Sequence, residues 1–279
     1  MSRTTSTLLF LGDCFTPSLT RSIILITVLC GTGARLVGED FSHKGCAPPP
    51  AGVVSWWPGD GNADDIVGPN QGQLFGGARF APGFVGQAFK FDGINDYFQS
   101  GASGLPESSA DRTLEMWVKL DSILPSDVTA TEYFEDFFAG YGQPGYATEF
   151  FELFSEYEPP YGNALAWSQW SDQLAGPHLH LGEPFEPNRG WHHVAVTLIS
   201  NSNIGIVLFL DGVPVARRQN YQIATPGETS FLMGRIPGAN GDIRRMHGQL
   251  DEVTVYNRAL LPDEIAAIFR AGKAGKCKP

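Results

Sequence analysis

An acidic loop near the start of the chain offers the oxygen-rich side chains that a hard cation requires. It has the sequence GDGNADD and spans Gly59–Asp65. Calcium takes carboxylate, amide and backbone carbonyl oxygens as ligands, and this loop supplies all three within seven residues. The sequence therefore predicts Ca²⁺ as the metal for this loop. The alternative is that Asp60 and Asn62 accept hydrogen bonds from their own backbone and only form a turn.

A second cluster of polar and aromatic side chains lies between Leu120 and Asn188. The segment has 12 acidic and 14 aromatic residues but no Lys or Arg, and it is too aromatic for a disordered tail. A sugar site needs an exposed ring for stacking and polar groups that fix hydroxyls. Ordinary packing is the alternative. The residues that we expect to form a sugar-binding platform are Trp167, Trp170 and Tyr146, with Tyr141 and Tyr161 nearby.

One histidine pair in the same segment has the spacing of a metal site. His178 and His180 share one face of an expected strand, and two such side chains can bind zinc when a third ligand is near. No third ligand is in view, so a partly solvated strand face is the favoured interpretation.

Short apolar runs separated by turn residues must position these side chains. The 279 residues are 42% hydrophobic and include 33 Gly and 20 Pro, which favours an all-β domain with tight connections. One helix is expected at Pro262–Gly272, with Pro first and Gly272 as C-cap. The pattern predicts a two-sheet antiparallel sandwich with one short C-terminal helix. The expected strands are Val53–Trp57, Gly86–Asp92, Asp96–Ser100, Arg112–Leu120, His178–Gly182, Trp191–Ile199, Ile204–Gly212, Ser230–Arg235 and Gly248–Asn257.

Alternation within two of these strands predicts which side chains share a face. In Arg112–Leu120, an apolar face is made by Leu114, Met116 and Val118, with Glu115 on the other side. The same rule divides the last strand into one side with Leu250, Glu252, Thr254 and Tyr256, and another with Asp251, Val253 and Val255.

The start of the chain has the order of a secretory signal. Arg21 precedes an apolar core at Ser22–Cys30, and small residues follow up to Ala34. The core has only about nine residues, whereas a membrane-spanning helix needs about 20, so we expect no permanent membrane span. The predicted organisation is a leader at 1–34, a Pro-rich linker at 35–51, a domain at 52–273 and a tail at 274–279. The protein is then secreted or associated with the cell surface.

The cysteine count predicts a disulfide, and the net charge argues against one class of partner. Cleavage after Ala34 removes Cys14 and Cys30 and leaves Cys46 and Cys277, which are best explained as one disulfide in an exported domain. Two free thiols are the alternative. The net charge of -11 argues against nucleic acid, because binding to phosphates needs clustered Lys and Arg.

Five segments span about Val53 to Arg270, and they are, in order, WWPGDGNADDIVG, FDGINDYF, TLEMWVKL, GWHHVAVT with FLDGVPV, and GQLDEVTVYNRALLPDEI. Taken together in this order, they resemble laminin-G-like jelly-roll modules of the concanavalin A-like lectin/glucanase superfamily. The resemblance implies a jelly-roll sandwich in which the last strand lies beside the first, close to the expected disulfide. It also implies calcium at a sandwich edge, held by Asp60, Asn62 and Asp251.

The superfamily includes glycoside hydrolases, but this chain lacks their alternating Glu-x-Asp-x-Glu strand. Glu149 and Glu152, like the acids near Glu135, are spaced so that neighbours face opposite sides of a strand. No nucleophile elbow is present. The resemblance favours a packing role for His192 and His193. We therefore predict a protein that is not an enzyme.

The predicted function is an exported recognition module that binds a glycan or a cell-surface protein and is stabilised by calcium. One alternative is a structural or adhesive module of the cell envelope that has no small ligand. The other is a glycoside hydrolase whose acids lie in the segment 120–188, which could not be matched to the family strand by strand. That segment is expected to be an insertion or an elaborated set of loops.

Overall fold

The first 44 residues lie outside the part of the chain that the structure describes. They include the expected leader and most of the expected linker. Within the described part, no helix is long and apolar enough to cross a membrane. The computed structural model describes residues 45–121, 134–143, 149–158, 162–167, 179–184, 190–200, 202–219, 223–227, 229–236 and 244–279.

The first sheet has eight antiparallel strands. Its order is β13-β12-β11-β6-β15-β4-β3, and β1 also pairs with β15. The last strand therefore lies beside the first, as the family resemblance implied. The strands are β1 (Val53–Trp57), β3 (Arg79–Pro82), β4 (Gln87–Asp92), β6 (Arg112–Leu120), β11 (His192–Ile199), β12 (Gly205–Leu210), β13 (Val213–Arg218) and β15 (His247–Tyr256).

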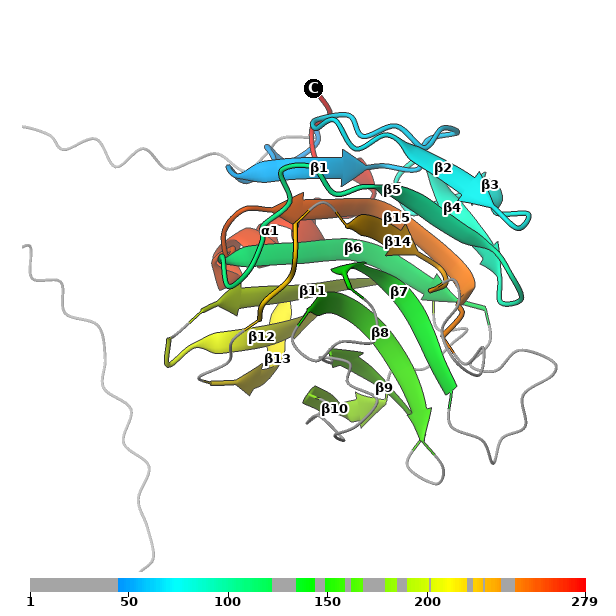
Figure 1. Cartoon of the computed structure of the whole chain (residues 1–279). Coiled ribbons are helices and arrows are strands. Elements are labelled where there is room, and N and C mark those ends of the chain that lie inside the picture. The colour runs from blue at the N-terminus through cyan, green and yellow to red at the C-terminus, as the bar shows by residue number, and fades with distance from the viewer. Residues whose placement is uncertain are drawn as a thin grey trace, which may run out of the picture. The chain divides into compact units, whose positions relative to one another are not determined.

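The second sheet has seven antiparallel strands in the order β10-β9-β8-β7-β14-β5-β2. Figure 1 shows β7, β8 and β14 lying across the face of β6, β11 and β15. The two layers confirm the predicted all-β jelly-roll sandwich. The strands are β2 (Gly72–Phe75), β5 (Tyr97–Gly101), β7 (Phe134–Gly142), β8 (Phe150–Glu158), β9 (Gly162–Trp167), β10 (Leu179–Pro184) and β14 (Ser230–Met233).

The acidic, aromatic segment between Leu120 and Asn188 is not only a set of loops. Its described parts form β7, β8, β9 and β10, four neighbouring strands of the second sheet. Phe138 and Phe151 are buried in the main core. The aromatic content therefore packs the second sheet against the first.

The main core lies between the sheets. The predicted apolar face of β6 is confirmed, because Leu114, Met116 and Val118 are all fully buried there. Trp57 of β1 stacks on Phe231 of β14, with ring centroids 4.3 Å apart. Burial of such aromatic side chains is the main stabilisation of a sandwich.

The helix α1 (Pro262–Ala271) begins and ends as predicted and is followed by the short 3-10 helix η2 (Gly272–Ala274). Its apolar residues Ile265 and Ile268 pack against Ala195, Phe209 and Tyr256 of the first sheet. These strand residues point away from the main core, so α1 covers the outer face of the first sheet. That face is defined here by Glu115, Trp117, His193, Thr254 and Tyr256.

The predicted alternation in β15 is wrong for Leu250 and Asp251, because Leu250 lies in the main core with Val253 and Val255 and Asp251 does not. Glu252 has a φ of +58°, and the pairing register with β6 shifts between Asp251 and Thr254. This bulge inserts one extra residue, which leaves Val253 and Val255 in the main core and places Asp251 and Glu252 consecutively on the outer side. Glu252 and Asp251 were expected on opposite faces.

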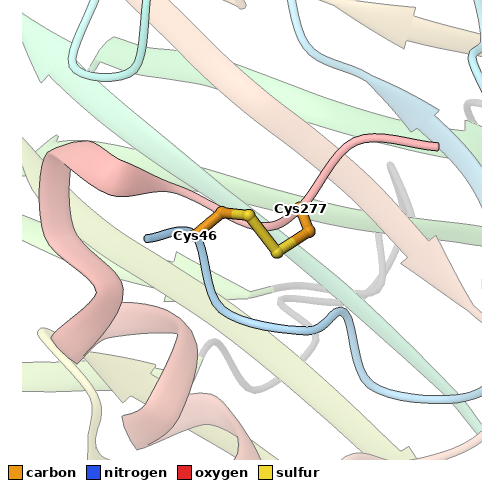
Figure 2. Close-up of a disulfide and its surroundings, with 2 residues drawn as sticks. All are labelled: Cys46 and Cys277. Atoms are coloured by element: carbon orange, nitrogen blue, oxygen red, sulfur yellow. A yellow bond between two sulfur atoms is a disulfide. The ribbon is translucent and has the colours of Figure 1, made fainter. Parts of the chain in front are cut away.

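The two ends of the described domain are joined by the expected disulfide. Cys46 and Cys277 are bonded across a sequence separation of 231 residues, and Figure 2 shows the bond between the first described segment and the segment that follows the helix. Ala47 forms a parallel bridge with Lys276. The end of the expected linker and the expected tail therefore form part of the folded unit.

Candidate functional site

The outer side of the second sheet carries a half-exposed aromatic pair. In the β2 and β5 register, Phe75 lies opposite Tyr97 and Gln73 opposite Gln99. Alternation turns Phe98 into the core, so these four side chains project from the other side, here named the β2–β5 face. The Phe75 and Tyr97 rings are stacked, with centroids 4.6 Å apart and planes 10° apart.

Polar groups next to this pair can hold hydroxyls. Gln99 donates from Nε2 to Ser230 Oγ at 2.8 Å, and Gln73 is exposed. Amides both donate and accept hydrogen bonds. The combination of ring faces and amides can bind a ligand that has apolar and hydroxyl-bearing sides.

The backbone below Tyr97 is fixed by a buried carboxyl group. Asp96 is only 3% exposed, and its Oδ2 accepts a hydrogen bond from the Asp92 amide at 3.0 Å. Burial raises the pKa of Asp96, and the charge of Asp92 adds to this shift. The FDGINDYF segment therefore forms a tight turn that positions Tyr97.

The residues of the predicted sugar-binding platform are not those of the β2–β5 face. Trp170 and Tyr146, like Tyr161, lie outside the described residues, and of Trp167 only the backbone, at the end of β9, is described. Tyr141 is buried and is not part of a surface. Its hydroxyl donates to the Pro106 carbonyl at 3.0 Å, and burial raises its pKa to about 12.

Acidic residues of β7 and β8 bind an arginine rather than forming an open pair. Arg244 Nε lies 2.8 Å from Glu135 Oε2, and its Nη1 lies 2.8 Å from Glu152 Oε2. Both carboxylates are buried. Glu149, the other acid considered for hydrolysis, is half-buried just before β8.

The three predicted calcium ligands each have protein partners. Asp60 Oδ1 accepts from the Gln87 amide at 2.9 Å, and its Oδ2 contacts the Lys278 ammonium. Asn62 Oδ1 accepts from the Asp64 amide at 3.2 Å, which is the turn geometry of the alternative. In the described part of the chain, no three His, Cys, Asp or Glu residues are grouped for a metal. Calcium binding stays a prediction.

Asp65 holds the GDGNADD loop together, and the sequence did not single it out. Its Oδ1 accepts from the amides of Trp56, Val67 and Gly68 at 2.8 to 3.1 Å. Its Oδ2 accepts from the Asn70 amide at 3.2 Å. One buried carboxylate thus binds the end of the loop to β1. The only signal in the sequence is an Asp placed before a Gly-Pro-Asn turn.

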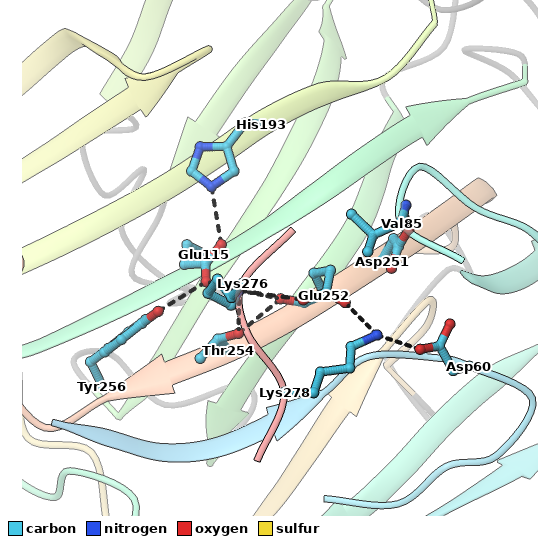
Figure 3. Close-up of polar contacts among 10 residues, drawn as sticks. All are labelled: Asp60, Val85, Glu115, His193, Asp251, Glu252, Thr254, Tyr256, Lys276 and Lys278. Carbon is cyan, nitrogen blue, oxygen red and sulfur yellow. Dashed lines mark hydrogen bonds and ion pairs between the residues drawn. The ribbon is translucent and has the colours of Figure 1, made fainter. Parts of the chain in front are cut away.

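A buried polar network connects the outer face of the first sheet to the C-terminal segment (Figure 3). Glu115 of β6 accepts from Lys276 Nζ at 2.6 Å and from the Tyr256 hydroxyl at 3.2 Å. Its Oε2 lies 3.0 Å from His193 Nε2. Burial alone would raise the pKa of Glu115, but Lys276 and His193 together lower it to about 2. The carboxylate is therefore charged at neutral pH.

The histidines follow their predicted packing role in part. His193 is fully buried in the network. His192 Nδ1 lies 2.9 Å from Asp211 Oδ2 at the β12–β13 turn, and this pair closes the end of β11. His178 lies outside the described residues, and of His180 only the backbone is described.

The buried carboxyl group of Asp251 predicts how the stability of the fold depends on pH. It is fully buried, its Oδ2 accepts from the amides of Phe84 and Val85 at 2.8 Å, and burial raises its pKa from 3.8 to about 8. The folded state therefore keeps a proton that the unfolded chain releases near pH 3.8. The stability from this group is fully present below that pH and is lost as pH rises through about 8.

Asp251→Asn keeps the acceptor oxygen but cannot ionise. Between about pH 5 and about pH 9, in EDTA so that no calcium binds, we expect the melting temperature of wild type to fall relative to that of the variant. Asp64→Asn, a change at an exposed carboxylate, is the matched control and should follow wild type. Parallel curves for wild type and Asp251→Asn would contradict a raised pKa.

Sequence comparison matches residues 92–266 to a family model described as the concanavalin A-like lectin/glucanases superfamily. The match runs from the DGIND turn through β15 into α1. Comparison with curated protein sequences finds no match.

Several solved structures share the fold at low sequence identity. Domain 4 of AbnA, an extracellular arabinanase from Geobacillus stearothermophilus solved with arabinotriose, has a TM-score of 0.54 and 16% identity, covering 77% of this chain and 97% of that domain. Trypanosoma rangeli sialidase solved with sialic acid has a TM-score of 0.55 and 21% identity, covering 80% of this chain and 33% of the sialidase. The binding domain of Paraclostridial Mosquitocidal Protein 1 has a TM-score of 0.54 and 12% identity, and the match covers 78% of this chain and 52% of that chain.

Proposed function

Because the chain belongs to the concanavalin A-like lectin/glucanases superfamily, we propose that it is an exported, non-catalytic recognition module. Its ligand is a glycan that binds on the β2–β5 face of the second sheet. The observation that carries this proposal is the stacked, half-exposed pair of Phe75 and Tyr97 beside the amides of Gln73 and Gln99.

Chemical complementarity supports a sugar as the ligand. A pyranose or furanose ring has C–H groups that pack on an aromatic face and hydroxyls that bond to amides. Domain 4 of AbnA, which this chain covers almost completely, has been solved with arabinotriose, and this supports the choice of a glycan.

Support for a non-catalytic role comes from the acids of β7 and β8. A hydrolytic pair of carboxyl groups must reach the glycosidic bond. Glu135 and Glu152 are both buried against Arg244 instead. The hydrolase alternative would be favoured if a panel of polysaccharides were cleaved and Glu152→Gln abolished the cleavage.

The proposal includes calcium as a stabilising ion for the loop Gly59–Asp65. Asp60, Asn62 and Asp251 would supply its side-chain oxygens. Lys278 contacts Asp60, so calcium must compete with an ammonium group for that carboxylate. A melting temperature that does not change between calcium and EDTA would remove calcium from the proposal.

The glycan site is tested by removing one ring at a time. Tyr97→Ala and Phe75→Ala should each weaken binding to a glycan array by at least about tenfold, which corresponds to about 1.4 kcal/mol. Val213→Ala, a change at a 56% exposed side chain of the first sheet, is the control and should bind as wild type does. Binding that survives both ring deletions would place the site elsewhere. An array without any bound glycan would favour the structural or adhesive module.

A further inference from the structure

The C-terminal segment, Gly275–Lys278, lies on the outer face of the first sheet after α1 and η2 have ended. The amide of Ala47 donates to the Gly275 carbonyl at 2.9 Å, and the amide of Cys277 donates to the Ala47 carbonyl at 2.8 Å. These bonds tie the segment to the other end of the domain. The ladders of the first sheet form without it.

The segment inserts one lysine into a site that is built for an ammonium group. Lys276 Nζ donates to Glu115 Oε1 at 2.6 Å, to Thr254 Oγ1 at 3.0 Å and to the Glu252 carbonyl at 3.3 Å. These are three acceptors for the three N–H bonds of an ammonium. Nζ also lies 4.8 Å from the centre of the Trp56 ring, and the side chain is 1% exposed.

The bulge at Glu252 shapes this site. Its positive φ marks the extra residue of β15, and its carbonyl accepts both from Lys276 Nζ and from Thr254 Oγ1. A strained conformation of this kind persists only where surrounding contacts hold it. The C-terminal lysine is one of these contacts.

In addition to these contacts, the disulfide ties this short terminal segment covalently to the other end of the domain, which limits the chain entropy that the segment would gain by detaching. Cys46 and Cys277 are both half-exposed, which gives a small thiol a route to the bond. We propose that the segment Gly275–Lys278 is a redox-controlled latch: reduction of the disulfide by a dithiol lets Lys276 leave its site and opens the outer face of the first sheet.

The chemistry is ordinary thiol–disulfide exchange. A thiolate of the dithiol attacks one cysteine sulfur, forms a mixed disulfide and releases the other cysteine as a thiolate, which takes up a proton. The second thiol of the reagent then closes its own disulfide and frees the first cysteine. Two electrons and two protons pass from the dithiol to the protein, and the covalent tie between the two ends is lost.

Acylation of lysine amines by an amine-reactive ester tests the latch on the full chain. In the oxidised protein, Lys276 should react slowly because it is buried, and exposed Lys273 should react quickly. With dithiothreitol, Lys276 acylation should become at least about tenfold faster while that of Lys273 stays the same. Peptide mass spectrometry reads both residues in one sample.

The reduced protein must stay folded for this result to mean local opening. Hydrogen exchange of β6 and β15 amides should therefore change much less than that of the segment Gly275–Lys278. If β6 and β15 open together with Lys276, the segment is not a separate latch and the inference fails.

A second measurement avoids the reductant. In the double variant Cys46→Ser and Cys277→Ser, Lys276 should be acylated as fast as in the reduced wild type. Slow acylation of Lys276 in the reduced protein, or in this variant, would overturn the inference, because the ammonium would then stay in its site without the disulfide.

Discussion

Replacing Lys276 with Met is expected to lower the free energy of unfolding of the oxidised protein by about 3–5 kcal/mol, the usual cost of removing one partner of a buried ion pair. Glu115 would stay fully buried without its nearest counter-charge, which lies 2.6 Å away in wild type. Chemical denaturation at neutral pH, followed by tryptophan fluorescence, measures the change. Three of the six Trp residues, Trp56, Trp57 and Trp117, are buried in or beside the first sheet.

Two further variants separate the charge from the packing of the side chain. Lys273→Met removes an exposed lysine of the same terminal region and should change the stability by no more than about 0.5 kcal/mol. Adding Glu115→Gln to Lys276→Met should recover part of the loss, because the buried carboxylate is then neutral. A double variant that is less stable than Lys276→Met alone would contradict a charge-based effect.

Local patterns predicted the elements whose signals lie within one segment. The bounds of β6 follow from an alternating run between two turns, and α1 follows from Pro at its start and Gly272 at its end. The disulfide followed from the cysteine count. The strand and helix signals depend on residues that are neighbours in the chain, and the disulfide depends only on the number of cysteines.

The bulge at Glu252 could not be predicted in the same way. Alternation assumes one residue per pairing position, and an extra residue leaves the apolar pattern of Val253 and Val255 intact. The bulge is held by the pairing of β15 with β6 and by the ammonium of Lys276, which lies 24 residues further along the chain than Glu252. Neither contact can be predicted from the residues next to Glu252 in the sequence.

The candidate site was missed for a related reason. Phe75 belongs to a four-residue strand, GQLF, which contains Gly and carries little strand signal. Only the pairing of β2 with β5 places its ring against Tyr97. The aromatic segment between Leu120 and Asn188 placed Tyr141 near the predicted sugar-binding platform, but that side chain is part of the core.

The loop that suggested calcium leads to the second large expected effect. Asp65→Ala should lower the free energy of unfolding by about 4 kcal/mol. Two of the amides that Asp65 accepts from, those of Trp56 and Asn70, are buried, and each buried donor without an acceptor costs about 1–3 kcal/mol. The amides of Val67 and Gly68 are only partly buried, so water can replace part of their bonds. Chemical denaturation in the presence of EDTA measures this effect apart from any bound calcium.

Asp64→Ala is the matched control, because it removes an exposed carboxylate from the same loop. It should change stability by no more than about 0.5 kcal/mol. If the loop is organised by hydrogen bonds to Asp65, the loss in Asp65→Ala has the same size with EDTA and with calcium. If calcium organises the loop, Asp65→Ala costs less in EDTA, where wild type has already lost the ion. Equal stabilities for Asp65→Ala and Asp64→Ala would show that the four backbone bonds of Asp65 do not hold the loop to β1.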